Sequence, residues 1–145
     1  MQAPEAKKKH NDPVKKYKVI GRIKIDKIQI DYPIIDTTTA ESLNISVTRF
    51  CGSNINGPGN CVIAGHNMKD GSIFGNLKKL TPGDTVKLYD STGSMQQYKI
   101  TDTYTVDPTD LNPLDQETDG KTIITLITCT TNGKQRLIVK GISTQ

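Results

Sequence analysis

A cysteine and an arginine flank a candidate hairpin near the end of this chain. Cys129 ends a run of β-favouring residues, Asn132-Gly133 follows as a turn signal, and Arg136 opens the next such run. Asn-Gly is a strong signal for a two-residue hairpin turn, because Asn and Gly tolerate the positive φ angles that the turn requires. With that turn, Cys129 lies directly opposite Arg136 on the same face of the sheet, with Cβ atoms about 5 Å apart.

This pairing would place a fixed cation beside a thiol, which favours the nucleophilic thiolate. The guanidinium could equally stabilise an oxyanion or orient a substrate carbonyl.

A proton carrier is still needed for nucleophilic chemistry at the cysteine. Of the two histidines, His10 and His66, the second is better placed, because it follows directly on a predicted strand. Cysteine and histidine together form the minimal unit of nucleophilic acyl transfer. The residue types alone leave open the alternative that both side chains are structural.

Strands must position these side chains, because the apolar residues are mostly Ile, Val and Leu, Thr is abundant, and aromatic residues make up only 5% of the chain. Eight short strand-like segments separated by turn signals predict an all-β sandwich or barrel. These segments are 19–25, 29–34, 48–50, 60–64, 85–89, 96–106, 122–129 and 136–139.

Little helix is expected. Residues 39–43 fit a single turn, and residues 72–80 fit a short helix with Ser72 as its N-cap. Ile73, Phe74, Leu77 and Leu80 have helix-like spacing. Of these, Phe74, Leu77 and Leu80 are predicted to pack on the core rather than bind a substrate. The segment 107–120 contains two prolines and five acidic residues, which predicts a long surface loop of the kind that is often functional.

A length of 145 residues predicts one domain. We place it at residues 17–145, after a basic leader, residues 1–16, whose few apolar residues predict disorder. Much of the net charge of +4 lies in that leader. Such a basic segment is typical of a solvated tail, or of a segment that lies near an anionic surface. The near absence of interleaved aromatic residues gives nucleic-acid binding little support. No apolar run approaches the roughly 20 residues of a membrane-spanning helix.

Three cysteines are an odd number. Cys51 and Cys61 could form a disulfide across the Gly- and Asn-rich segment between them, but Cys61 occupies an inward-facing strand position, which favours a buried free thiol. No CxxC or HxxxH spacing connects the cysteines with His66, so we predict no structural zinc site. A Ser-His-Gly-Cys motif, typical of L,D-transpeptidases, is absent.

Three motifs in order resemble the sortases, the cysteine transpeptidases of Gram-positive cell surfaces. They are Ala-Gly-His at 64–66, Thr-Leu-Ile-Thr-Cys at 125–129 and the arginine at 136. The resemblance covers about residues 17–141 and implies an eight-stranded sortase-type β-barrel with one or two short helices. The compact pattern is similar to class D or E, or to a short class A enzyme. No acidic cluster matches the calcium site of some class A members, so no metal or other cofactor is expected.

The resemblance also implies a mechanism and its catalytic residues. Cys129 would cleave the Thr-Gly bond of a Leu-Pro-x-Thr-Gly-like sorting signal through a thioacyl intermediate. His66 would protonate the leaving amine and deprotonate the incoming one, while Arg136 would hold the signal's threonine or its oxyanion. The implied substrate-binding residues are Thr128, Leu111, Pro113 and Leu114.

The partners that the resemblance implies are surface proteins with sorting signals, and a cell-wall precursor or pilin amine as acceptor. The implied location is the extracellular face of the membrane, with an N-terminal anchor outside this sequence. The alternative is an inactive sortase-like barrel that serves as a cell-surface binding module.

Overall fold

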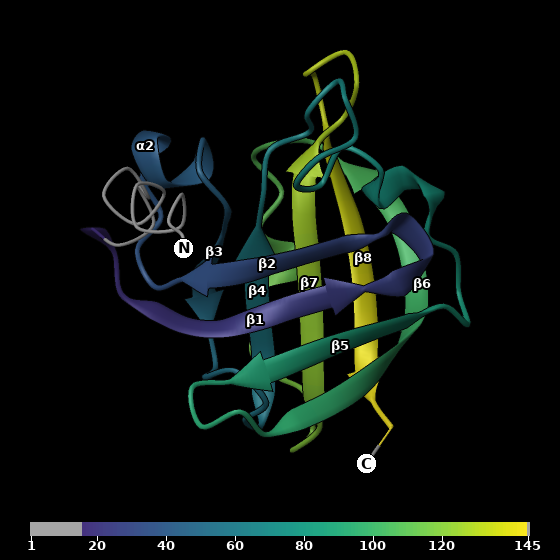
Figure 1. Ribbon diagram of the computed structural model, residues 1–145. Helices are drawn as coiled ribbons and strands as arrows, with labels where there is room; N and C mark the ends of the chain where they lie inside the picture. Colours follow the sequence, from purple (N-terminus) through teal and green to yellow (C-terminus); the bar gives the residue numbers. More distant parts are fainter. Residues whose placement is uncertain (1–15, 145) are drawn as a thin grey trace, which may run out of the picture.

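The computed structural model describes residues 16–144, so the predicted leader falls outside the described residues except for Lys16. Eight strands close into one barrel in the order β1-β2-β3-β4-β7-β8-β6-β5 (Figure 1). This confirms the predicted all-β barrel. The strands are β1 (Val19–Ile25), β2 (Ile30–Ile35), β3 (Val47–Gly52), β4 (Gly59–Ala64), β5 (Thr85–Asp90), β6 (Met95–Val106), β7 (Thr122–Cys129) and β8 (Arg136–Ser143).

The predicted strands all exist, and their ends differ from prediction most at β8. This strand continues to Ser143 instead of ending at Val139, and it pairs with β6 on one side and β7 on the other. Lys140 and Gly141 interrupt the apolar pattern of this strand, and for that reason the sequence pattern did not predict the residues after Val139 as strand. Gly141 allows a close approach of the two strands, because a Cβ atom there would lie only 3.2 Å from the backbone oxygen of Lys99 on β6.

Branched aliphatic side chains fill the barrel, as the composition predicts. Ile23, Ile34, Ile63, Leu88 and Ile124 are among those with no exposed surface. The predicted core residues between β4 and β5 join them: Phe74 and Leu77 are fully buried, and Leu80 is 2% exposed.

The helix predicted at 72–80 was wrong. Only a short 3₁₀ segment, η3 (Leu77–Lys79), forms there. Ile73 adopts a left-handed φ of 55°, which no right-handed helix accommodates. Its backbone N–H donates to the Tyr32 hydroxyl at 2.9 Å, and Ser72 bonds to the Asp70 carboxylate instead of capping a helix. Tertiary and local polar contacts thus override the helix-like spacing.

Other helical segments are short. The predicted turn near 39–43 is confirmed as α2 (Ala40–Leu43), in which the Thr39 hydroxyl accepts from the backbone N–H of Ser42. Two further 3₁₀ segments are η2 (Asp26–Ile28) and η4 (Asn112–Leu114), the latter within the predicted long loop. Among residues 16–144, no helix has the length and apolar character to cross a membrane.

Strands β4, β7 and β8 lie side by side in the barrel wall, and β1, β2 and β5 cross in front of them in Figure 1. β4 and β7 are parallel neighbours, whereas β7 and β8 are antiparallel. The carboxyl ends of β4 and β7 and the start of β8 therefore meet at one edge of the barrel, where the predicted catalytic residues stand.

Candidate active site

The hairpin between β7 and β8 pairs Cys129 with Arg136, as predicted. Its turn is different, however. The backbone N–H of Gly133 donates to Thr130 O at 2.8 Å, and that of Thr130 donates to Gln135 O at 2.9 Å. Residues 131–134 thus form a four-residue loop in place of the two-residue Asn-Gly turn. Because the longer loop adds one residue to each side, the register is unchanged.

The side chain of Asn132 explains the longer loop. Its Oδ1 atom accepts from the Thr130 hydroxyl at 2.7 Å and from the backbone N–H of Lys134 at 2.9 Å. Asn132 is absent from the positive-φ positions of the described chain, while Gly133 has a φ of 74°. A two-residue type I′ turn needs positive φ at both positions. Local side-chain bonding therefore selects a different turn from the same two residues.

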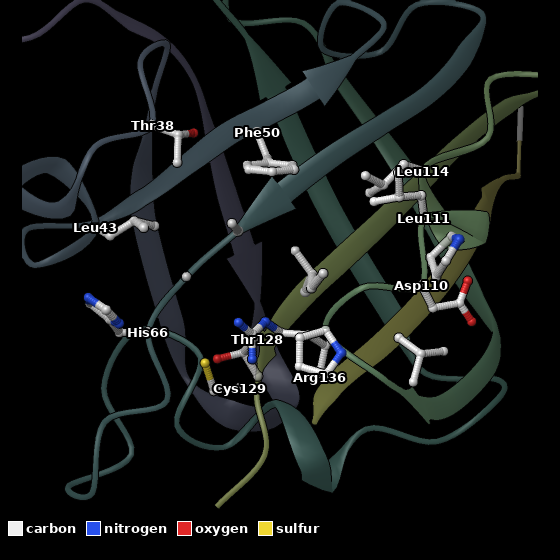
Figure 2. Close-up of a pocket in the computed structure, with 16 residues that line it drawn as sticks. Thr38, Leu43, Phe50, His66, Asp110, Leu111, Leu114, Thr128, Cys129 and Arg136 are labelled. Atoms are coloured by element: carbon white, nitrogen blue, oxygen red, sulfur yellow. The ribbon is translucent and has the colours of Figure 1, made fainter. Parts of the chain in front are cut away.

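The parallel pairing of β4 with β7 brings His66 to the same edge. Ala64 is the register partner of Ile127, and the backbone N–H of Gly65 donates to Ile127 O at 3.1 Å. His66 and Cys129 each lie two residues beyond these partners. Figure 2 shows the Cys129 sulfur between His66 on one side and Arg136 on the other. The structure thus brings together all three predicted catalytic residues.

Asn67 is a site residue that sequence reasoning missed. Its side-chain amide donates to the backbone oxygen of Cys129 at 2.9 Å. The residue directly after the histidine therefore holds the strand end that carries the thiol. The only signal in the sequence was its adjacency to His66, and the partner is defined by the tertiary pairing of β4 with β7.

A pocket of about 350 Å³ opens over these residues (Figure 2). Its walls come from the ends of β4 and β7, from β3, from the segment around α2 and from the segment around η4. The residues that line it are Thr38, Leu43, Phe50, Ala64, Gly65, His66, Val106, Pro108, Asp110, Leu111, Pro113, Leu114, Ile127, Thr128, Cys129 and Arg136. All seven predicted site residues are among them.

The pocket presents apolar surface to solvent. Leu111 is 68% exposed and Phe50 is 49% exposed, and Figure 2 shows them on separate walls. Pro113 is buried, while Leu114 is partly buried. Burial of exposed apolar side chains by a ligand is favourable, and mostly apolar pockets with a few polar groups are typical binding sites.

Thr128 brings an unusual polar group to this pocket. The residue is only 4% exposed. Its hydroxyl oxygen is one of two buried side-chain polar atoms without a hydrogen-bond partner in the described part of the chain. An unpaired buried polar group costs about 1–3 kcal/mol. A ligand that bonds to this hydroxyl would remove that cost.

The other two thiols are separate from the pocket, and all three cysteines are free. Burial raises the pKa of Cys61 to about 12, and partial burial also raises the pKa of Cys51. Both thiols therefore resist ionisation. Within residues 16–144, no three His, Cys, Asp or Glu side chains are grouped to hold a metal ion.

Comparisons with known proteins agree on one family. A family model described as the sortase domain matches residues 23–143. Sortase A of Bacillus anthracis is 32% identical over 141 residues, which cover 95% of this chain and 66% of the relative. Sortase A of Listeria monocytogenes is 32% identical over 112 residues, covering 77% of this chain and 49% of the relative. The chain thus spans about two thirds of the first curated relative's length and about half of the second's.

Solved structures give the same result. Sortase A from Corynebacterium diphtheriae has a TM-score of 0.81 and 27% identity, covering 89% of this chain and 62% of that one. A sortase D5 transpeptidase from Clostridium perfringens has a TM-score of 0.80 and 30% identity, covering 99% of this chain and 90% of that one.

Proposed function

This chain belongs to the sortase family, and we propose that it is a cysteine transpeptidase that cleaves a Leu-Pro-x-Thr-Gly-like sorting signal between Thr and Gly. The observation that carries this proposal is the convergence of His66, Cys129 and Arg136, from three neighbouring strand ends, on one pocket. A nucleophile, a proton carrier and a donor that stabilises an oxyanion support acyl transfer, and the Arg136 guanidinium can serve as that donor.

In the first half-reaction, the Cys129 thiolate attacks the carbonyl carbon of the signal's threonine. The new C–S bond forms a tetrahedral intermediate, whose oxyanion is stabilised by the Arg136 guanidinium. His66, as imidazolium, gives its proton to the leaving glycine amine while the C–N bond breaks. The product is a thioester between Cys129 and the threonine.

In the second half-reaction, an incoming amine attacks the thioester carbon and gives its proton to His66. A new C–N bond forms, the C–S bond breaks, and Cys129 returns as thiolate beside the imidazolium. Both steps use the same three side chains, so one pocket serves donor and acceptor in turn.

The other predicted substrate residues receive the rest of the signal. Thr128 offers its unpartnered hydroxyl beside the thiol. Leu111, Pro113 and Leu114 form an apolar wall that suits the Leu-Pro end. We further propose surface proteins with sorting signals as donors, a cell-wall precursor or pilin amine as acceptor, and the extracellular face of the membrane as the site of action.

Mass spectrometry of the protein with a Leu-Pro-x-Thr-Gly peptide and a primary amine tests the proposal. We expect an acyl adduct on Cys129 and an amine-exchanged peptide. Cys129→Ala should remove both products without altering the fold, while Cys51→Ala, at a thiol outside the pocket, should retain them. Absence of both products across a panel of sorting motifs would refute the transpeptidase. Binding of the peptide without turnover would instead support the inactive binding module.

A further inference from the structure

The pocket wall around η4 is attached to the barrel by buried and partly buried side chains. Lys140 Nζ on β8 donates to the backbone oxygen of Pro113 at 2.9 Å and to Thr125 Oγ1 at 2.7 Å. The Thr125 hydroxyl on β7 donates in turn to Asn60 Oδ1 at 2.7 Å. Asn60 Nδ2 on β4 completes the set by donating to Pro113 O at 2.9 Å and to Asp115 O at 3.1 Å.

Gln116 holds the same wall from its far end. Its side-chain amide accepts from the backbone N–H of Asn60 at 3.1 Å and donates to Asn60 O at 2.8 Å. It also donates to Leu114 O at 3.0 Å. Three successive carbonyl groups, at residues 113–115, therefore accept hydrogen bonds from side chains rather than from solvent alone.

Burial makes these bonds strong positional constraints. Asn60 is 1% exposed and Thr125 is fully buried, so water competes little for their polar groups. Lys140 is partly buried between β6 and β7, and desolvation lowers its pKa. An ammonium withdrawn from water is costly unless it is well bonded, which makes its two acceptors here structurally important.

We propose that Asn60, Thr125 and Lys140, together called the clamp, are positioning residues that fix the η4 wall relative to Cys129 and so determine the affinity for the Leu-Pro end of the signal. This inference rests on the proposed function. The geometric reason is that Thr125 and Cys129 lie on the same strand, β7. One strand therefore fixes the positions of both the η4 wall and Cys129. The site then favours a peptide whose length matches the distance between the wall and the thiol.

Hydrogen–deuterium exchange of the ligand-free protein tests the positional part. Thr125→Val removes the hydroxyl at nearly constant volume, whereas Thr125→Ser retains it. We expect faster exchange in peptides covering 107–120 for Thr125→Val and Lys140→Met, but near wild-type exchange for Thr125→Ser. Lys99→Met, at an exposed lysine on β6, serves as the control. Wild-type exchange rates at 107–120 in both Thr125→Val and Lys140→Met would overturn the clamp.

Peptide kinetics test the specificity part. We expect Lys140→Met to raise KM about tenfold with a much smaller change in kcat, because only binding geometry is lost. The effect should depend on the peptide. Replacing the Leu of the peptide by Ala should raise KM strongly for the wild-type protein but only a little for Lys140→Met. Additive effects of the two changes would show general destabilisation and overturn the specificity role.

The two proposals fail separately. If wild type shows no turnover, the transpeptidase fails, and the clamp is then judged by exchange and by the Kd of the peptide for the Cys129→Ala protein. If wild type is active and Thr125→Val exchanges faster at 107–120 but keeps its KM, the clamp holds the wall without determining affinity. That outcome also overturns the inference.

Discussion

The side-chain amide of Asn67 donates a 2.9 Å hydrogen bond to the backbone oxygen of Cys129. This bond links the segment after β4 to the end of β7, so the strand ends that carry His66 and Cys129 are joined beyond their last ladder pair. The separation of His66 and Cys129 thereby depends on a third side chain, which itself need not touch a ligand.

Asn67→Ala should lower kcat roughly tenfold and leave KM nearly unchanged, because it loosens the catalytic pair and leaves the pocket walls intact. Steady-state kinetics with a quenched-fluorescence peptide would measure both constants. Alkylation of Cys129 by a small reagent, which does not need His66, should continue in the variant. An unchanged kcat would show that the bond does not position the pair.

Thr128→Val should separate stability from activity. The substitution replaces an unpartnered buried hydroxyl with a methyl group of similar size, so the free energy of unfolding should stay constant or rise by about 1 kcal/mol. Turnover should nevertheless fall about tenfold if the hydroxyl bonds to the signal. Thr128→Ser should retain activity. Chemical denaturation and peptide kinetics measure the two effects, and full activity of the valine variant would exclude a role for the hydroxyl.

Arg136→Lys keeps a positive charge opposite Cys129 but removes the planar fork of donors. We expect kcat/KM to fall about 10²-fold, within the range seen when an oxyanion donor is lost. Arg22→Lys, at an exposed arginine on β1 that pairs with Asp31, is the matched control and should keep wild-type activity. If Arg136→Lys were fully active, positive charge alone would suffice and the guanidinium's planar set of donors would not be needed.

Alkaline pH should destabilise the fold through Cys61. Burial raises the pKa of this thiol from its ordinary value of 9.0 to about 12 in the folded protein. A raised folded pKa means that the unfolded state loses its proton first, so the contribution is fully present below about pH 9 and is lost as pH rises toward 12. Urea unfolding between pH 8.5 and about 11 would measure it. Cys61→Val should show a shallower decline than wild type, and parallel curves would contradict the assignment.

The sequence predicted the strands, and it picked out three residues that the structure brings to one pocket, because alternating apolar residues and ordered motifs are local signals. It did not predict the turn at Asn132, where side-chain bonds compete with the backbone geometry that Asn-Gly usually adopts. Nor did it predict the irregular path at Ile73, whose left-handed φ depends on contacts with Tyr32. Asn67 and Lys140 escaped notice for a related reason. Their partners, Cys129 and Pro113, are fixed by strand register between distant segments, which periodicity does not encode.

The parallel neighbours β4 and β7 have a consequence for the folding pathway. Parallel strands cannot form from a hairpin, and a long chain segment containing β5 and β6 separates these two. Closing such a large loop has a high entropic cost, so contacts of this kind tend to form slowly. A refolding chain would therefore carry Cys129 without His66 beside it until the barrel closes. Under the proposed mechanism, reactivity toward the sorting signal would then report completed folding, and partly folded molecules would be protected from premature acylation.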